Sequence, residues 1–343
     1  MVAHGSKKVY NGVMLFDVIT AGAATQDVFL RSSSFEQKRD PTAPDGFEAC
    51  VPLGAKIALD DMVFSTGGGA TNAATTFARY GLKTACIARV GHDAAGAQVH
   101  ATLTEEGIST VGLQIDSKIQ TAYSVIMLAG SGHRSIMTYR GAAKKIHPDE
   151  IPWKDLKTRW YYMTSVGGNV ELLSRLFVHA EKGKAKIAWN PGNDELKLGL
   201  KKLEPFLVRT SVLILNREEA AILSNAPPRH LETILSILSR YPQQALVITD
   251  GQKGAYIEAE GQIFFAPALK ANRVNTTGAG DAFGSGFVAA LMKGKTPAIA
   301  LKIGMLNATG VITHMGAKAG ILKHMPGPLA IKKVRTRILK HVT

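Results

Sequence analysis

The sequence predicts an α/β protein with a doubly wound, mostly parallel sheet, helices on both faces, and a smaller β-sheet built from separate pieces of the chain. Apolar runs typical of buried strands alternate with amphipathic helix-like segments along most of the 343 residues. Two stretches, residues 26–64 and 110–140, break this alternation because they hold β-branched and alternating residues with no helix between them. We expect these stretches to form the smaller sheet, with antiparallel strands.

The first half of the chain supplies four regular elements in close succession. Residues 16–21 are predicted to form a buried strand. Residues 69–80 are predicted to form a helix, because small and apolar residues fall on one side and Gly81 ends it. A strand at 84–90 and an amphipathic helix at 94–106 follow.

The second half repeats this rhythm. Strands are predicted at 160–163, 185–189, 212–215 and 245–249, with helices at about 170–182, 217–223, 230–240 and 282–292. The two interrupting stretches contain strand-like segments at 27–31, 50–59, 110–115, 123–128 and 135–139. The polar loop 32–46 is interpreted either as a mobile part of the smaller sheet or as a simple insertion.

Composition favours a soluble enzyme. Hydrophobic residues make up 45% of the chain and charged residues 20%, and the length allows one large α/β domain with an accessory piece or two modest domains. No apolar run reaches the ~18 residues of a membrane span, and no signal-peptide pattern is present. The two cysteines, Cys50 and Cys86, give neither a disulfide framework nor a metal cluster. We therefore expect a cytoplasmic protein without a membrane partner.

The net charge of +14 is concentrated partly in a basic C-terminal tail, residues 324–343. Ile331, Val334 and Ile338 lie at helical spacing there, which predicts a terminal helix docked by its apolar side. A contact with nucleic acid is the alternative. No aromatic residue alternates with the charges to stack on bases, so nucleic acid is not an expected partner. The surplus charge on the remainder suits polyanionic substrates such as nucleotides.

The glycine-rich run at residues 275–287 is the most informative segment for function. Gly278-Ala279-Gly280 and then Asp281 lead directly into the apolar helix. Backbone N–H groups at such a helix start can bind one anion, and the helix dipole adds to the attraction. Asp281 comes too late for an N-cap but suits a base beside a transferred phosphate. A glycine-softened helix start with an incidental aspartate is the structural alternative.

Two other glycine motifs are excluded by spacing. A dinucleotide fingerprint would need glycine where the chain has Phe283. A Walker A loop would end at Gly294-Lys295-Thr296, but its first glycine is replaced by Ala289 and the segment ends a helix.

The run 275–287 resembles the C-terminal signature of the ribokinase/PfkB family of sugar and nucleoside kinases. The N-terminal signature of that family is similar to residues 68–74, followed by Gly81 and Gly91. The resemblance covers about residues 13–322. It implies a ribokinase-like three-layer α/β/α fold, with a kinase domain at 13–323 and a discontinuous lid from about 26–64 and 110–140. In the family the lid covers the sugar site and sometimes forms a homodimer contact, and its closure would exclude water.

The resemblance assigns the phosphate chemistry to the glycine-rich run. Asp281 is the expected general base, which takes the proton of the acceptor hydroxyl as it attacks the γ-phosphate of ATP. The amides of Gly278, Ala279 and Gly280 are expected to hold the equatorial phosphate oxygens, where charge accumulates.

The acceptor site is expected around Asp27, just past the first strand, where open α/β sheets bind ligands. Asp27 would accept hydrogen bonds from substrate hydroxyls; a turn aspartate is the alternative. Gly68 and Gly69 would admit the sugar close to the backbone, and Asn72 offers a donor and an acceptor for a diol. Ribokinases proper usually carry lysine in place of Gly69, which favours another sugar or a nucleoside over ribose.

The nucleotide side is expected at the ends of later strands. Asn216 and Glu219 match the family's N-x-x-E motif and suit Mg²⁺ bound through waters, although Glu219 could equally be a first-turn acid. The remaining nucleotide-binding candidates are Asn190 and Gly192 after the strand 185–189, Thr249, Gly251 and Gly254 in a T-x-G-x-x-G-like turn, and Asn307 on the C-terminal helix.

Many relatives bind K⁺ beside the anion hole with an aspartate at the position of Asn275. Because Asn275 lacks that charge, we expect weak or no activation by K⁺. The sequence thus predicts an ATP- and Mg²⁺-dependent kinase that phosphorylates an alcohol of a sugar. The first alternative is an adenosine-type nucleoside kinase, which a stacking aromatic in the lid would favour. A non-catalytic sensor or nucleic-acid-binding protein is the second alternative, and retention of Asp281 argues against it.

Overall fold

The main sheet is built from short apolar strands, and the structure is a computed structural model that describes residues 9–10, 13–43, 46–128 and 134–341. Its strands are β1 (Val9–Tyr10), β2 (Val13–Ala21), β7 (Thr84–Gly91), β8 (Ser109–Asp116), β11 (Lys157–Met163), β12 (Lys186–Trp189), β13 (Val212–Asn216), β14 (Ala245–Thr249), β15 (Ala255–Ala259), β16 (Gln262–Ala266) and β17 (Arg337–His341).

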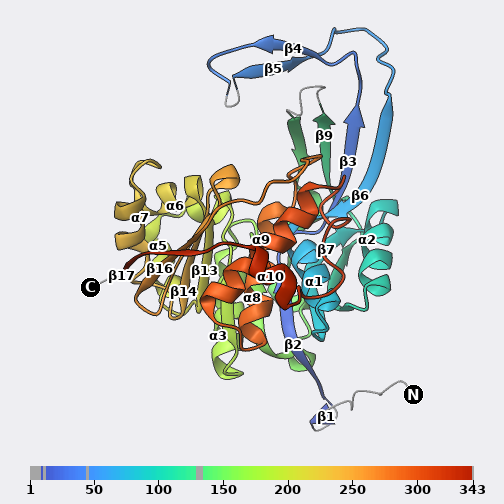
Figure 1. Ribbon diagram of the computed structural model, residues 1–343. Coiled ribbons are helices and arrows are strands. Elements are labelled where there is room, and N and C mark those ends of the chain that lie inside the picture. The colour runs from blue at the N-terminus through green and yellow to red at the C-terminus, as the bar shows by residue number, and fades with distance from the viewer. Residues whose placement is uncertain (1–8, 11–12, 44–45, 129–133, 342–343) are drawn as a thin grey trace.

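Within the described residues this 11-stranded sheet runs in the order β17-β16-β15-β14-β13-β12-β11-β2-β7-β8, with β1 paired to β2 (Figure 1). The strands from β14 to β8 are parallel to one another, while β15, β16 and β17 are antiparallel. Every residue of β7 is buried, as expected for a parallel strand covered on both faces. The predicted doubly wound sheet is confirmed.

Helices cover both faces of the main sheet. They are α1 (Gly69–Arg79), α2 (Ala94–Glu105), α3 (Val170–Lys182), α4 (Asn193–Leu196), α5 (Leu200–Leu207), α6 (Arg217–Ser224), α7 (Leu231–Leu238), α8 (Ala279–Met292), α9 (Pro297–Ile312) and α10 (Pro328–Lys333). Helices α3, α5, α6 and α7 enclose one apolar cluster with the strands, and α1, α8 and α9 enclose a second on the opposite face.

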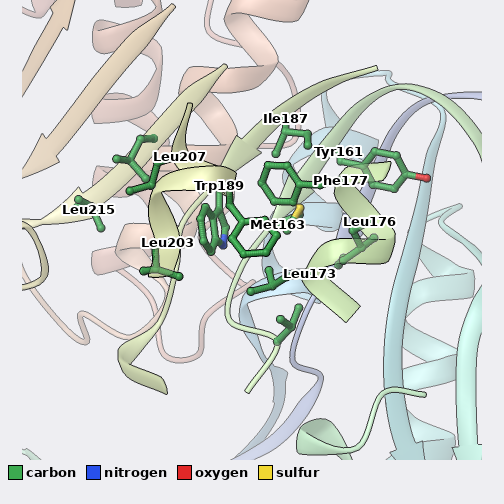
Figure 2. Close-up of a cluster of buried hydrophobic side chains, with 14 of the residues drawn as sticks. Tyr161, Met163, Leu173, Leu176, Phe177, Ile187, Trp189, Leu203, Leu207 and Leu215 are labelled. Atoms are coloured by element: carbon green, nitrogen blue, oxygen red, sulfur yellow. The ribbon is translucent and has the colours of Figure 1, made fainter. Parts of the chain in front are cut away.

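Successive residues of a single strand enter these two clusters in turn. On β11, Tyr161 and Met163 face α3, whereas Tyr162 between them faces α1 and α8. Figure 2 shows the first cluster, where Phe177 of α3 meets Trp189 of β12 edge to face with ring centroids 5.8 Å apart. The period-two burial explains why both faces of these strands are apolar.

A smaller sheet projects from the main body as the lid (Figure 1). Its strands are β3 (Thr25–Arg31), β6 (Asp61–Gly67), β9 (Ala122–Leu128) and β10 (Arg134–Tyr139), in the order β10-β9-β3-β6. A separate ribbon of β4 (Glu36–Arg39) and β5 (Phe47–Cys50) extends beyond it. The lid therefore comes from two separate stretches of the chain, as predicted.

Three details of the predicted lid need correction. Residues 110–115 belong to β8, an edge strand of the main sheet, because β8 pairs with β7. The lid is not wholly antiparallel, since β3 and β9 pair in parallel. The second lid strand along the chain, β6, starts at Asp61, after the predicted segment 50–59, most of which is loop.

The C-terminal tail also differs from its predicted single helix. Helix α10 ends at Lys333, and residues 337–341 continue as β17 along β16. Val334 is buried and Ile331 packs against the second cluster, but Ile338 is half-exposed on the strand. The helical spacing predicts the structure of the tail only as far as α10. Residues 337–341 form a strand because they pair with the edge of the sheet at β16. None of the helices within the described ranges is long and apolar enough to cross a membrane.

Candidate active site

A cavity of about 310 Å³ lies between the lid and the carboxyl ends of the main parallel strands. Nine of the residues singled out from the sequence line it: Asp27, Gly68, Gly69, Asn72, Asn190, Gly192, Glu219, Gly278 and Asp281. They come from β3, the start of α1, the loop after β12, the first turn of α6 and the start of α8. The fold thus brings together segments that are more than two hundred residues apart in the sequence, as the hydrogen bond between Asn72 and Asp281 illustrates.

Helix α8 begins with a left-handed turn that only glycine adopts readily. Gly278 has φ 82° at the N-cap, and a Cβ there would lie 2.6 Å from Cβ of Ala317. Gly280 has open space around its α-carbon. The N–H of Ala279 donates a long hydrogen bond of 3.3 Å to the Thr276 carbonyl, so this N–H already has one acceptor. The start of α8 therefore brings the positive end of the helix dipole to the cavity. Gly278 lines this cavity, whereas Ala279 and the exposed Gly280 do not.

Asp281 stands in the first turn of α8 and faces this cavity. Its Oδ2 accepts a 2.8 Å hydrogen bond from Nδ2 of Asn72 on α1. Burial raises the pKa of Asp281 above the ordinary value, Asn72 and the cation Lys318 lower it, and the charge of Asp27 raises it. A carboxylate with a raised pKa in a cavity is suited to accept a proton.

Asn72 is left with one unused polar atom. Nδ2 donates one of its two hydrogens to Asp281, and Oδ1 is buried without a hydrogen-bond partner in the described structure. Asn72 therefore keeps one N–H donor and the acceptor Oδ1. Buried acceptors are rarely left unpaired, so Oδ1 fits the hydroxyl of a bound molecule.

Asp27 lies inside β3 rather than just past the first strand, which corrects the predicted position. The side chain is 3% exposed, and Oδ1 accepts a 3.0 Å hydrogen bond from Oγ1 of Thr25. Burial raises the pKa of Asp27, while hydrogen bonds from Thr25 and Ser124 and the charge of Lys318 lower it. Since the carboxylate is on a lid strand, it is not a turn residue.

The glycines before α1 allow close packing around Asp27. A Cβ on Gly67 would lie 2.0 Å from Oδ2 of Asp27, and one on Gly68 would lie 2.4 Å from the Ala23 carbonyl oxygen. A Cβ on Gly69 would approach three atoms of Thr164 to 2.9 Å. A lysine at position 69 would therefore require Thr164 to move.

On the other side of the cavity, Asn216 and Glu219 form a reciprocal helix cap. Oδ1 of Asn216 accepts from the N–H of Glu219, and Oε2 of Glu219 accepts from the N–H of Asn216, both at 2.8 Å. Burial raises the pKa of Glu219. Only one of its carboxylate oxygens is used by the cap, so the other is free to act on the cavity. Asn216 is exposed and does not line the cavity.

The turn after β14 is joined to this cap by a buried ion pair. Arg217 of α6 contacts Asp250 at 2.7 Å, and both side chains are about 10% exposed. Thr249, Gly251 and Gly254 surround Asp250 but do not line the cavity. Gly254 has φ 123°, and a Cβ there would lie 2.0 Å from the Ala266 carbonyl oxygen. The turn is therefore held rigidly beside the start of α6.

The comparisons with known proteins agree with this geometry. The sequence profile described as pfkB family carbohydrate kinase matches residues 47–324. The chain belongs to this family. It is therefore a carbohydrate kinase, a phosphotransferase with an alcohol group as acceptor.

Ribokinases and a nucleoside kinase are among the similar proteins. The ribokinase of Haemophilus influenzae is 26% identical over 264 residues, covering 74% of this chain and 83% of its own length. The ribokinase of Arabidopsis thaliana, solved with ribose and ATP, superposes with a TM-score of 0.72 at 19% identity, covering 93% and 98% of the two chains. The nucleoside kinase of Methanocaldococcus jannaschii superposes with a TM-score of 0.71 at 21% identity, covering 89% and 94%.

One predicted nucleotide-binding residue of this kinase lies elsewhere. Asn307 of α9 is fully buried, and Nδ2 donates to Oγ1 of Thr76 at 3.1 Å and to the Ala282 carbonyl at 2.8 Å. Its Oδ1 accepts from the N–H of Leu322. These bonds use the amide within the core, so we assign Asn307 to the packing of α9 against α1 and α8.

Sequence reasoning missed several residues around the cavity. Thr164 and Ser165, which follow β11, line the cavity. The rule that ligands bind at the carboxyl ends of parallel strands located Asn190 and Gly192 and would also have found these two residues. The fully buried Glu195 holds the neighbouring loops, because it accepts from the N–H groups of Val166, Gly168 and Gly192. Lys318 had no sequence signal, because a lysine in a loop is usually exposed.

Proposed function

We propose that this kinase transfers the γ-phosphate of ATP to a hydroxymethyl or similar alcohol of a sugar, with Asp281 as general base. The observation that carries the proposal is the Asn72–Asp281 hydrogen bond at the start of α8, facing the cavity that also contains Asp27. A positioned carboxylate beside a helix N-terminus joins the two requirements of phosphoryl transfer, a proton acceptor and an anion site.

In this mechanism the side chains bind the acceptor and orient the base. Asp27 and Oδ1 of Asn72 accept hydrogen bonds from substrate hydroxyls and orient the sugar. Asp281 takes the proton of the attacking alcohol, and Nδ2 of Asn72 keeps its carboxylate pointed at that proton. The backbone amides of Gly278, Ala279 and Gly280 stabilise negative charge on the transferred group. Closure of the lid excludes water from the site.

The residues beside the cavity fit Mg²⁺-ATP. Within the described ranges no cluster of three acidic, histidine or cysteine side chains could hold a metal by itself. Mg²⁺ in such kinases needs only one or two protein carboxylates together with phosphates and waters, and the free oxygen of Glu219 meets that need. When bound, the ion would offset charge on the phosphate oxygens. We assign Asn216, Thr249, Gly251 and Gly254 to the nucleotide, as neighbours of this carboxylate.

A monovalent cation fits poorly beside the anion hole. Oδ1 of Asn275 accepts from the N–H of Thr277 at 3.1 Å and from its Oγ1 at 3.0 Å. Nδ2 of Asn275 is buried without a hydrogen-bond partner in the described structure. This amide would therefore present a donor, not an oxygen, to any further ligand, and we propose that K⁺ is not required.

A nucleoside acceptor is less well supported than a sugar. The apolar wall of the cavity consists of Ile126 and Ile136, and the described lining contains no aromatic side chain that could stack on a base. Because the similar Methanocaldococcus enzyme is a nucleoside kinase, nucleosides should be tested beside sugars. A panel of sugars and nucleosides, with ADP release measured in the presence of ATP and Mg²⁺, tests the choice. Faster turnover of a nucleoside than of every sugar would reverse it.

The outer face of the lid supports the proposal of a homodimer. Ser65 lies opposite Asp27 in the sheet, so Phe64 and Met62, one and three residues before it, point away from the cavity. These two side chains are 51% and 58% exposed. Met137 and Tyr139 of β10 extend the same apolar surface, because Ile136 and Thr138 line the cavity. A second copy of the chain would bury this surface.

A further inference from the structure

Lys318 is a buried cation directly behind the acceptor site. The residue is 6% exposed, and its Nζ donates to the Thr66 carbonyl at 2.7 Å and to Oγ1 of Thr71 at 2.9 Å. Oγ1 of Thr71 in turn donates to the Gly67 carbonyl at 2.6 Å. Lys318 therefore holds the end of β6 and the first turn of α1, the segment that carries Asn72.

The loop around Lys318 also supports the anion hole. Ala317 packs against Gly278 so closely that a Cβ on that glycine would lie 2.6 Å from it. Gly316 lies against Ser65 of β6, where an added Cβ would be 2.9 Å from Oγ. Residues 316–318 thus contact the phosphate side and the acceptor side of the cavity at once.

Burial of this ammonium group is costly and needs an explanation. Lys318 makes no ion pair within 4.0 Å in the described structure, although buried charges are usually paired. Glu106 acts on it weakly from a longer distance, and the two carboxylates with the largest effect are those of the cavity, Asp27 and Asp281. A structural role alone could be filled by an uncharged donor, whereas a charge is useful to these two carboxylates.

We propose that Lys318 is a positioning residue of the kinase reaction, which fixes the Gly67–Gly69 turn against the anion hole and supplies positive charge to the base Asp281. The inference rests on the proposed role of Asp281. Lys318 would thus set both the distance between the acceptor and the phosphate and the pKa of the base Asp281.

The charges that face Lys318 agree with this role. The pKa of Lys318 is lowered to about 8, because the effect of burial exceeds that of the nearby negative groups. The groups that raise the pKa are Asp27 on β3, Asp281 on α8, Cys86 on β7 and Glu106 after α2. The remaining charged neighbour is Arg79 of α1, which donates to the Lys318 carbonyl. Deprotonation of Lys318 above pH 8 would therefore remove the positive charge beside Asp281 and raise the pKa of the base.

The pH profile of kcat, measured with saturating ATP and acceptor, tests the inference. In the wild-type enzyme kcat should decline as the pH rises through about 8, as Lys318 loses its proton. Lys318→Met should lower kcat by roughly 10- to 100-fold, lose this alkaline decline and move the acidic limb, set by Asp281, to higher pH. The KM for ATP should change less than kcat.

Two further variants separate charge from shape. Lys318→Gln keeps a donor for Thr66 and Thr71 but no charge, so its acidic limb should move as in Lys318→Met. Lys323→Met removes an exposed lysine from the same loop and should leave both limbs unchanged. Thermal unfolding of each variant checks that it is folded, and the wild-type profile tests the inference even if Lys318→Met does not fold.

The outcomes for Lys318 and for the base are distinct. An alkaline limb that is absent from the wild type, or an acidic limb that Lys318→Gln leaves in place, overturns the role of Lys318 while Asp281→Asn remains inactive. If Asp281→Asn is as active as the wild type, the proposed function itself fails.

Discussion

Nδ2 of Asn72 donates a 2.8 Å hydrogen bond to Oδ2 of Asp281, although 209 residues separate them in the sequence. The bond joins the first turn of α1 to the first turn of α8. In the proposed mechanism this amide orients the base, and its Oδ1, which has no partner in the described structure, accepts from the acceptor hydroxyl. The proposal thus makes recognition of the acceptor and orientation of the base depend on the same side chain.

The first prediction concerns this pair. Asp281→Asn should lower kcat by at least ~10² with ATP affinity changed only a few-fold, because the shape survives and proton acceptance does not. Asn72→Ala should raise the pKa of Asp281 by removing a hydrogen bond that lowers it, so the acidic limb of kcat/KM should move to higher pH. An acidic limb unmoved by Asn72→Ala would contradict the assignment.

The second prediction separates acceptor binding from ATP binding. Asp27→Ala should lower kcat/KM for the acceptor by several-fold to ~10³-fold, because a hydrogen bond to a charged group is worth ~1.5–3 kcal/mol. The KM for ATP should stay nearly constant. Glu36→Ala, on the exposed ribbon strand β4, is the matched control. An equal effect on both substrates would make Asp27 a structural residue.

The third prediction concerns the metal. Glu219→Gln should raise the Mg²⁺ concentration for half-maximal rate, because a neutral amide attracts the cation less strongly. Its oxygen can still accept from the N–H of Asn216, so thermal stability should change little. Glu218→Gln removes an exposed charge one residue away and should leave the Mg²⁺ titration unchanged. If the wild type, Glu219→Gln and Glu218→Gln all give the same Mg²⁺ titration, Glu219 serves only to cap α6 and does not act on the metal.

The fourth prediction concerns monovalent cations. The rate should be the same in K⁺ and in a large organic cation at equal ionic strength, because Oδ1 of Asn275 is already occupied by Thr277. Asn275→Asp restores a negative charge and should make the rate respond to K⁺. A several-fold K⁺ activation of the wild type would disprove the interpretation.

The fifth prediction concerns assembly. Light scattering should give the mass of a dimer, and Phe64→Lys should shift the equilibrium toward monomer, because it places a charge on the apolar face. Ile222→Lys, at another exposed apolar residue far along the chain on α6, is the control and should leave the mass unchanged. A monomeric wild type at high concentration would exclude the lid dimer.

The sequence predicted local structure and the order of elements well, but not which strands pair. The period-two and helical patterns located β7, β11, α1 and α3 within a few residues. Whether residues 110–115 pair with β7 or with the lid depends on long-range contacts that periodicity does not encode. The same limit applies to residues 337–341, where the edge of β16 decides between helix and strand.

At the site, the motif residues could be located because glycine runs and strand ends carry a recognisable signal. The sequence could not show that Nδ2 of Asn72 already donates to Asp281, that Asn307 is enclosed in the core, or that Lys318 is buried. Each depends on side-chain packing between distant segments. The structure also shows that removal of the tail after Pro328 would not be neutral, since Val334 and β17 are part of the body.

Two of the backbone segments that join the lid to the main body are very short, and they contribute Ala23 and Gly68 to the cavity lining. Strand β2 ends at Ala21 and β3 begins at Thr25, while β6 ends at Gly67 and α1 begins at Gly69. Asp27 lies only a few residues away from each of these joints, directly or across the sheet. A rotation of the lid about these joints would move Asp27 relative to Asp281. The opening angle of the lid would therefore set the distance between the two carboxylates.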